Sequence, residues 1–117
     1  MNWKRKLLKY TQDNEFPKQP GIYILENRSN SKVYIGYTMN IKARIASHRS
    51  LLLNNKHYNR ELQFAFNREL LIANVLAIIP HANSTLLKDF ERILIKSAPQ
   101  LFPSGIINKQ LSRHAKY

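Results

Sequence analysis

With 117 residues, the chain is long enough for one compact domain and too short for two domains with separate cores. The absence of cysteine excludes a disulfide framework and thiolate zinc sites, and no apolar run approaches the roughly 20 residues of a membrane-spanning helix. A formal charge of +12 favours a polyanionic partner, with nucleic acid ahead of an anionic membrane surface.

Residues 1–19 are predicted to be a basic N-terminal extension. Residues 3–10 place Trp3 and Leu7 among several cations, a pattern that favours a short basic helix, and Pro17 then lies in a linker. No apolar signal-peptide core follows the basic start, so we expect a cytoplasmic protein that has no membrane contact.

Residues 21–36 predict a β-hairpin, because two apolar, β-rich runs are separated by the polar stretch Asn27–Ser31. Successive side chains of a strand point to opposite faces, so Tyr23 and Tyr34 are expected together on one face. The aliphatic side chains are expected on the other face, toward the core: Ile22, Ile24, Val33 and Ile35.

Residues 40–54 predict a helix that begins at Asn40, whose side chain suits an N-cap. An apolar stripe starts at Ile41, and Arg44 and His48 fall along its edge. We therefore expect both of these side chains to lean toward the protein body. Positive charge also gathers in this part of the chain, since no acid occurs between Glu26 and Glu61 and seven cations do: Arg28, Lys32, Lys42, Arg44, Arg49, Lys56 and Arg60.

The second half of the chain predicts a helix over residues 59–68, a buried strand over 71–79 and a helix over 84–98 that Ser84 or Thr85 would cap. Glu91 falls at the margin of the apolar face of this last helix, so its carboxylate should be partly desolvated and should need a partner. The predicted fold class is α/β, a small, mainly antiparallel three-stranded sheet flanked by helices. Residues 109–117 are a basic tail.

Two tripeptides stand at the strands of the hairpin, Gly21-Ile22-Tyr23 and, after an interval, Tyr34-Ile35-Gly36. With Arg44, His48 and a helical Glu91 downstream, they resemble the signature of the GIY-YIG nuclease family.

The resemblance covers about residues 20–108, which we take as the nuclease domain, and it includes members of the homing-endonuclease type. It implies the GIY-YIG nuclease fold and a DNA endonuclease that hydrolyses phosphodiester bonds with one divalent ion, Mg²⁺ or Mn²⁺. Specificity would then come from a homodimer or a partner subunit.

The resemblance also implies catalytic roles for the matching residues. Tyr23 would lie near the attacking water as general base or positioner, and nearby cations such as Arg44, or a metal ion, would have to lower its pKa from about 10. Tyr34 would hydrogen-bond the phosphate or the water. Arg44 would bind phosphate oxygens, and His48 would reach the same phosphate or help to move a proton. Glu91 would be the one protein carboxylate on the metal ion.

Six further side chains are expected to contact the substrate: Lys32, Tyr37, Lys42, Arg49, His57 and Asn108. His57 corresponds to a family histidine near the active site. Tyr37 stands where some relatives have a lysine, and Lys32 would compensate for that missing charge.

Two other interpretations use the same residues. In the first, the fold is kept but the site is idle, so that the protein only binds nucleic acid. In the second, the chain is a basic structural protein of a ribonucleoprotein or phage particle. Tyr23 and Tyr34 would then pack across the hairpin, and Glu91 would pair with Lys88 for about 0.2 to 0.5 kcal/mol.

Overall fold

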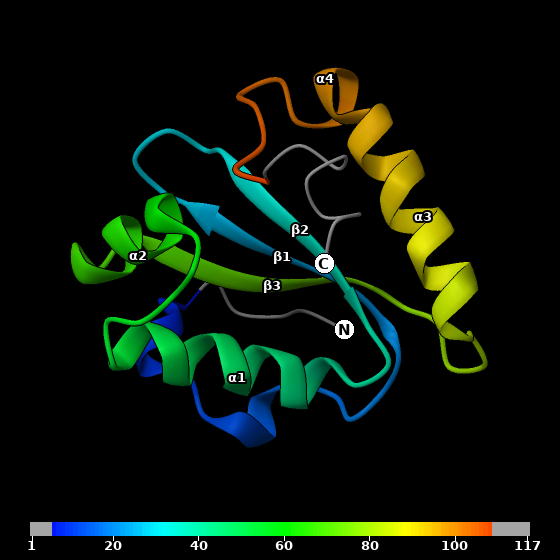
Figure 1. Cartoon of the computed structure of the whole chain (residues 1–117), viewed down its shortest axis with the longest axis horizontal. Helices are drawn as coiled ribbons and strands as arrows, with labels where there is room; N and C mark the ends of the chain where they lie inside the picture. Colours follow the sequence, from blue (N-terminus) through cyan, green and yellow to red (C-terminus); the bar gives the residue numbers. More distant parts are fainter. Residues whose placement is uncertain (1–5, 109–117) are drawn as a thin grey trace.

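The structure is a computed structural model that describes residues 6–108. Its centre is an antiparallel sheet in the strand order β2-β1-β3, with both neighbours of β1 running against it (Figure 1). The strands are β1 (Gly21–Asn27), β2 (Val33–Thr38) and β3 (Leu71–Ile78). The helices are α1 (Ile41–Leu53), α2 (Arg60–Asn67), α3 (Ser84–Lys96) and the short α4 (Ala98–Leu101). The predicted α/β fold is confirmed.

Both faces of the sheet are covered by helices. The face that carries Tyr23 and Leu25 packs against α1 and α2, including the buried Ile45, in one core cluster. The opposite face, which carries the aliphatic residues of the hairpin, packs against Leu87 of α3 in a second cluster. The aliphatic face therefore points into a core as predicted, and Tyr23 lies in a core as well.

The starts of α1, α2 and α3 are each capped by an asparagine side chain. Asn40 accepts a hydrogen bond from the backbone N–H of Ala43, which confirms the predicted cap of α1. The prediction that Ser84 or Thr85 caps the last long helix was wrong, because Asn83 accepts a hydrogen bond from the N–H of Leu86 at 2.8 Å. That helix ends at Lys96, and the short α4 follows it.

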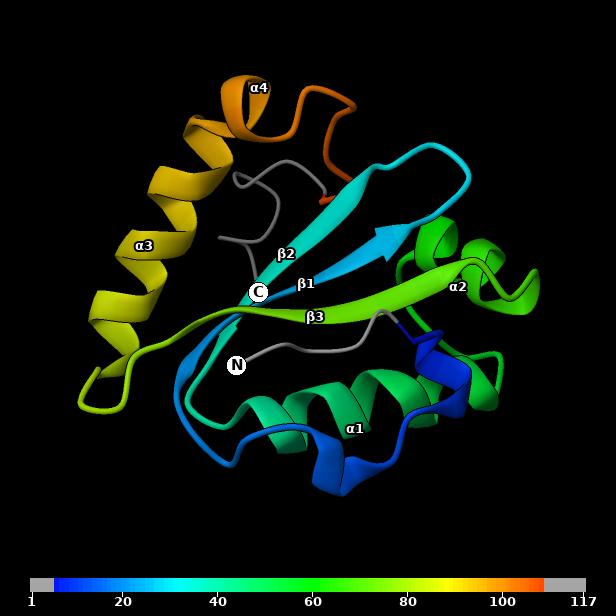
Figure 2. The same ribbon diagram turned by 180° about the vertical axis from the view of Figure 1, so that it is seen from behind.

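The N-terminal segment forms two 3₁₀ turns, η1 (Leu8–Tyr10) and η2 (Asp13–Glu15), beside α1 (Figure 2). Of the helix predicted over residues 3–10, the described part contains only η1, and residues 3–5 lie outside the described range. Leu8 and Phe16 are buried in the core cluster of α1 and α2, and Leu7 forms an isolated β-bridge with Ile72. The segment is thus packed on the domain and stabilises it. The tail 109–117 also lies outside the described range.

A membrane span is not found among the helices of residues 6–108, all of which are too short or too polar to cross a bilayer.

Candidate active site

The ring of Tyr23 crosses over Gly36 of the neighbouring strand, to which it is paired in register. A Cβ atom at position 36 would lie 2.3 Å from Cζ of Tyr23 and 2.4 Å from its hydroxyl oxygen. Any residue other than glycine would displace the phenol, so the glycine of the second tripeptide makes room for the tyrosine of the first. Gly21 allows β1 and β3 to approach each other closely, because a Cβ at position 21 would lie 2.1 Å from the carbonyl oxygen of Ala77.

His48 projects from α1 into the body of the protein and is only 3% exposed, as the helical pattern predicted. Its Nε2 lies 2.6 Å from the hydroxyl oxygen of Tyr23. The rings of Tyr23 and Tyr34 both meet the imidazole edge-on, with ring centroids 5.5 Å away in each case. Arg44, which was predicted to lean inward with His48, is instead exposed and flanks the site from the surface.

A chain of hydrogen bonds continues from His48 to the backbone. His48 Nδ1 lies 2.8 Å from His57 Nε2, and the backbone N–H of Asn59 donates to His57 Nδ1 at 3.0 Å. Because that Nδ1 is an acceptor, a neutral His57 carries its proton on Nε2 and donates it to His48. His48 must then carry its own proton on Nε2, from which it donates to Tyr23. One backbone amide therefore sets the tautomer of both rings.

Both imidazoles are held in the neutral state that this series of hydrogen bonds requires. Burial, helped by the nearby His57 and the charge of Arg44, lowers the pKa of His48 to about 3. Burial also lowers the pKa of His57. At neutral pH His48 is thus a fixed hydrogen-bond donor to the phenol.

The two phenols are neutral as well. Burial raises the pKa of Tyr23 far above its ordinary value, and the opposing effect of Arg44 is smaller. Burial likewise raises the pKa of Tyr34, with contributions from Tyr23 and Tyr58. Arg44 does lower the pKa of Tyr23, as predicted, but in the free protein desolvation outweighs this effect. Since His48 donates to Tyr23, the hydroxyl proton of Tyr23 is available for another oxygen.

Glu91 comes from α3 and is partly buried, as predicted from its place on the helix. Burial raises the pKa of its carboxyl group to about 7, and the charges of Arg44 and Lys88 oppose this shift. Within residues 6–108 the carboxylate makes no hydrogen bond and no ion pair, so the pair with Lys88 that the alternative interpretation requires does not form. A partly desolvated acid without a close cation suits a metal ligand.

The candidate site spans both sides of the sheet at its edge strand, β2. Helices α1 and α3 lie on opposite sides of the sheet, and both contact β2 (Figure 1). Electrostatic effects connect the groups across this edge: Arg44 acts on Tyr23 and Glu91, and the charge of Glu91 raises the pKa of Tyr34 in addition to burial. These groups are therefore within electrostatic reach of one another around this edge.

The side chains available as ligands indicate which metal ion the candidate site could hold. No group of three or more His, Asp or Glu side chains converges anywhere in residues 6–108, so a cage built entirely from protein ligands is not formed there. A single carboxylate that is completed by waters and phosphate oxygens fits Mg²⁺, which sheds its water shell reluctantly. The residues that are present therefore fit the ion that the resemblance implies.

Asn108 and Arg49, predicted as substrate-binding residues, are engaged within the protein. The side chain of Asn108 accepts a hydrogen bond from the N–H of Ile35 and donates one to its carbonyl oxygen, each at 2.7 Å. It thereby holds β2 at Ile35, the middle residue of the second tripeptide. Arg49 pairs with Asp13 and donates to Thr11, so it ties the N-terminal segment to α1.

The other three predicted contact residues lie outside the hydrogen-bonded cluster. Tyr37 packs in the core cluster on the α3 side of the sheet. Lys42 is half-buried and lines a shallow pocket of about 280 Å³ with Asp13 and Lys18. The aliphatic stem of Lys32 lies beside Gly105, in the segment after α4.

Sequence reasoning missed Tyr58 and Asn59. The hydroxyl of Tyr58 lies 3.3 Å from that of Tyr34, and its ring stacks on His57. Asn59 supplies the backbone donor to His57 and caps α2 through its side chain. An aromatic residue and a helix-capping Asn directly after the candidate histidine were the available signals.

The chain resembles known proteins in sequence and in fold. Residues 19–100 match the family described as the GIY-YIG catalytic domain. Among solved structures, the catalytic domain of the homing endonuclease I-TevI superposes with a TM-score of 0.61 at 26% identity, covering 74% of this chain and 97% of that one. A substituted form of the I-TevI catalytic domain gives a TM-score of 0.58 at 28% identity, covering 68% of this chain and 82% of that one.

A curated protein also matches over a short stretch. It is the UvrABC system protein C of Petrotoga mobilis, 40% identical over 45 residues, which are 38% of this chain and 7% of that protein. The chain thus spans only a small part of that much longer relative.

Proposed function

The chain belongs to the family of GIY-YIG catalytic domains, and from this premise we propose that it is a divalent-metal-dependent endonuclease that hydrolyses phosphodiester bonds of DNA. One observation carries the proposal. The phenol of Tyr23 is held by His48 beside Tyr34, within electrostatic reach of both Arg44 and Glu91. These are the groups that phosphodiester hydrolysis requires.

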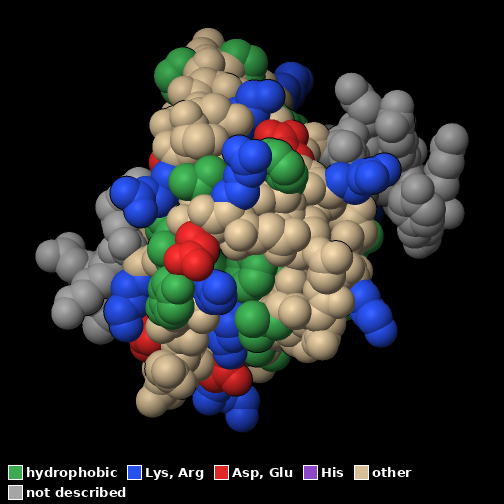
Figure 3. All heavy atoms as spheres, turned by 90° about the vertical axis from the view of Figure 1, so that its left-hand side faces the viewer, with side chains coloured by type: hydrophobic (Ala, Val, Ile, Leu, Met, Phe, Trp, Pro, Cys, Tyr) green, Lys and Arg blue, Asp and Glu red, His purple; other side chains and the backbone are tan. Residues whose placement is uncertain are grey.

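DNA binding is supported by the charge of the molecule. The formal charge is +12, and Lys and Arg side chains are spread over the face shown in Figure 3, where acidic side chains are fewer. Contacts of these cations with backbone phosphates would release counterions, so affinity should fall steeply as salt is added. Specificity would come from a homodimer or a partner subunit.

In the proposed reaction Arg44 binds the non-bridging oxygens of the scissile phosphate through its guanidinium fork and stabilises their growing charge. Tyr34 donates its hydroxyl proton to the same phosphate or to the attacking water. Both groups act in a partly desolvated site, where their interactions are stronger than in water.

Tyr23 orients the attacking water. Its hydroxyl proton is free, because the neutral His48 already donates to its oxygen. Burial keeps the phenol protonated in the free protein, which supports a positioning role for Tyr23 rather than the removal of a proton by a standing phenolate. His48 and His57 hold this oxygen in place.

Glu91 would hold one Mg²⁺ or Mn²⁺ ion through its carboxylate. When bound, the ion would act as a Lewis acid on the phosphate and the departing oxygen. The raised pKa of Glu91 supports this role, because a nearby cation offsets the cost of ionising a partly buried carboxyl group.

The test is cleavage of supercoiled plasmid and of a random-sequence DNA pool, with Mg²⁺ and with EDTA. Cutting should require the metal and should disappear in Tyr23→Phe, Arg44→Ala and Glu91→Gln. The control Asp89→Asn changes an acid on the same helix that pairs with Arg92 at the surface, and it should cut normally. Tight binding without cutting of either DNA would instead support an idle nucleic-acid-binding module.

A further inference from the structure

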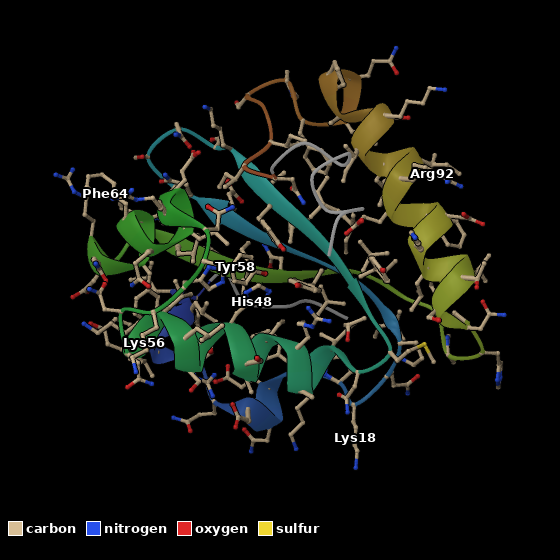
Figure 4. All side chains as sticks on the ribbon, in the orientation of Figure 1. Lys18, His48, Lys56, Tyr58, Phe64 and Arg92 are labelled. Atoms are coloured by element: carbon tan, nitrogen blue, oxygen red, sulfur yellow. The ribbon has the colours of Figure 1, made fainter. Side chains whose placement is uncertain are left out.

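Three rings form a row from the interior of the site to the surface of the protein. The rings of His48 and His57 lie edge to edge, joined by their hydrogen bond, with centroids 5.0 Å apart and planes at 15°, and the ring of Tyr58 stacks on His57 at 4.3 Å and 27°. Exposure rises along the row from 3% for His48 to 63% for Tyr58. The row therefore begins at the ring that hydrogen-bonds Tyr23 and ends at a ring that faces solvent (Figure 4).

The ring of Tyr58 is held in place without being covered. His57 supports one face and is itself fixed by hydrogen bonds at both ring nitrogens. The hydroxyl of Tyr58 reaches that of Tyr34 at 3.3 Å. Among residues 6–108 no other aromatic ring and no cation lies against Tyr58, and the residue is 63% exposed, so the described part of the chain leaves much of its ring open.

Two other exposed aromatic rings of the described chain, those of Phe64 and Tyr10, are engaged differently. Phe64, on α2, carries the guanidinium of Arg68 at 4.4 Å from its centroid. Tyr10 is 54% exposed, but its hydroxyl donates to Glu69, the ammonium of Lys9 lies 5.8 Å from its ring centroid, and no ring of residues 6–108 supports it. Tyr58 alone among these three combines an open face with a direct connection to the proposed catalytic groups.

A planar, rigid and open ring beside a phosphate site suits one ligand group in particular, a nucleobase. Stacking of a base on an aromatic side chain is favourable for every base, because each has a π face. In a paired duplex both faces of a base are covered by its neighbours, so only an unpaired base can reach such a ring. The exposed cations Lys56 and Arg60 flank Tyr58 in the sequence and would attract the strand that carries that base.

We propose that Tyr58 is a stacking platform for one unpaired base of the DNA strand, next to the phosphate that is cut. The substrate class is therefore DNA with an unpaired or distorted stretch rather than a regular duplex. This inference rests on the proposed function, since it places the base beside the same phosphate. If instead Tyr58 only covers His57 and orients Tyr34, a large apolar side chain with no π face would serve as well.

The experiment measures binding without cutting. In the Glu91→Gln background, 2-aminopurine is placed in turn at each position of a short unpaired stretch in otherwise duplex DNA. Stacking on Tyr58 should quench its fluorescence at one or two positions. Tyr58→Phe and Tyr58→Trp should keep the quenching, and Tyr58→Leu should lose it. The control Tyr10→Leu removes another exposed tyrosine and should leave the quenching intact.

Affinity gives the second readout. Tyr58→Leu should weaken binding to the DNA with unpaired bases by roughly 5- to 100-fold, with less than about a twofold effect on regular duplex. Equal effects on both DNAs, or quenching that survives Tyr58→Leu, would overturn the proposal.

The two proposals fail separately. Quenching that depends on Tyr58 in a protein that never cuts would refute the nuclease and leave the platform as a binding device. Cutting without any such quenching would refute the platform alone.

Discussion

The hydroxyl oxygen of Tyr23 lies 2.6 Å from Nε2 of His48, and that nitrogen is the donor because a backbone amide two residues beyond His57 sets the tautomers. A phenol buried to 1% exposure is thereby fixed in position while its own proton stays available.

Tyr23→Phe should remove cutting while it preserves DNA binding. The oxygen that orients the water is lost, which should slow cleavage by roughly 100- to 10,000-fold. The buried Nε2–H of His48 is left without an acceptor, at a cost of about 1 to 3 kcal/mol in stability. Single-turnover cleavage and urea unfolding check the two effects. Cleavage within twofold of the wild type in a folded variant would exclude Tyr23 from the reaction.

Gly36→Ala should destabilise the protein and displace the phenol. The added methyl group would overlap Cζ and the hydroxyl oxygen of Tyr23, and overpacking of this kind costs about 1 to 3 kcal/mol or more. Combining it with Tyr23→Leu should recover part of that loss, because the ring that clashes is gone. A double-mutant cycle of unfolding free energies measures the coupling, and strict additivity would contradict the overlap.

The stability of the protein should decrease in acid partly because of His48. Its pKa is about 3 in the folded state and about 6.5 when unfolded, so between these values the unfolded chain binds the additional proton. Stability from this group is complete above about pH 6.5 and falls by about 1.4 kcal/mol for each pH unit below it. The measurement is urea unfolding from pH 7 to pH 4.

The decrease in unfolding free energy for each pH unit should be smaller in His48→Gln than in the wild type. It should be unchanged in the control His81→Gln, which replaces an exposed histidine. The same slope in all three proteins would show that His48 does not titrate in this way.

Glu91→Gln should stabilise the protein at pH 8. The folded pKa of about 7 lies above the unfolded value, so the folded state loses stability as pH rises through this window and the carboxyl ionises. Because Glu91 is only partly buried, solvent screening reduces the gain from its removal to roughly 1 kcal/mol. Thermal unfolding at pH 8 measures it, with Asp89→Asn as the control.

Mg²⁺ should raise the melting temperature of the wild type and leave Glu91→Gln unchanged. An acid with only a structural role would give the opposite pattern, with lower stability on substitution and no dependence on the ion.

The fold was predictable because its signals are local. The alternation of Ile22 to Leu25, the cap at Asn40 and the apolar periodicity from Leu86 to Leu94 each specify one element, and their order specifies a small α/β sheet. The correct grouping of Tyr23 with Tyr34 on one face follows from the period of a strand.

The site was less predictable because it depends on packing. The sign of the pKa shift of Tyr23 follows from burial under α1 and α2, which no pattern within the hairpin reveals. The role of Asn108 depends on a long-range contact with Ile35. Tyr58 was missed because a surface aromatic residue gains meaning only from the ring beneath it.

The measurement that tests the central claim most directly is paramagnetic broadening by Mn²⁺ in protein with isotope-labelled tyrosine rings. If the phenols and Glu91 surround one metal site, substoichiometric Mn²⁺ should broaden the signals of Tyr23 and Tyr34 first and spare Tyr10, and Glu91→Gln should abolish the effect. Broadening of Tyr10 to the same extent, or broadening that persists in Glu91→Gln, would contradict the shared site.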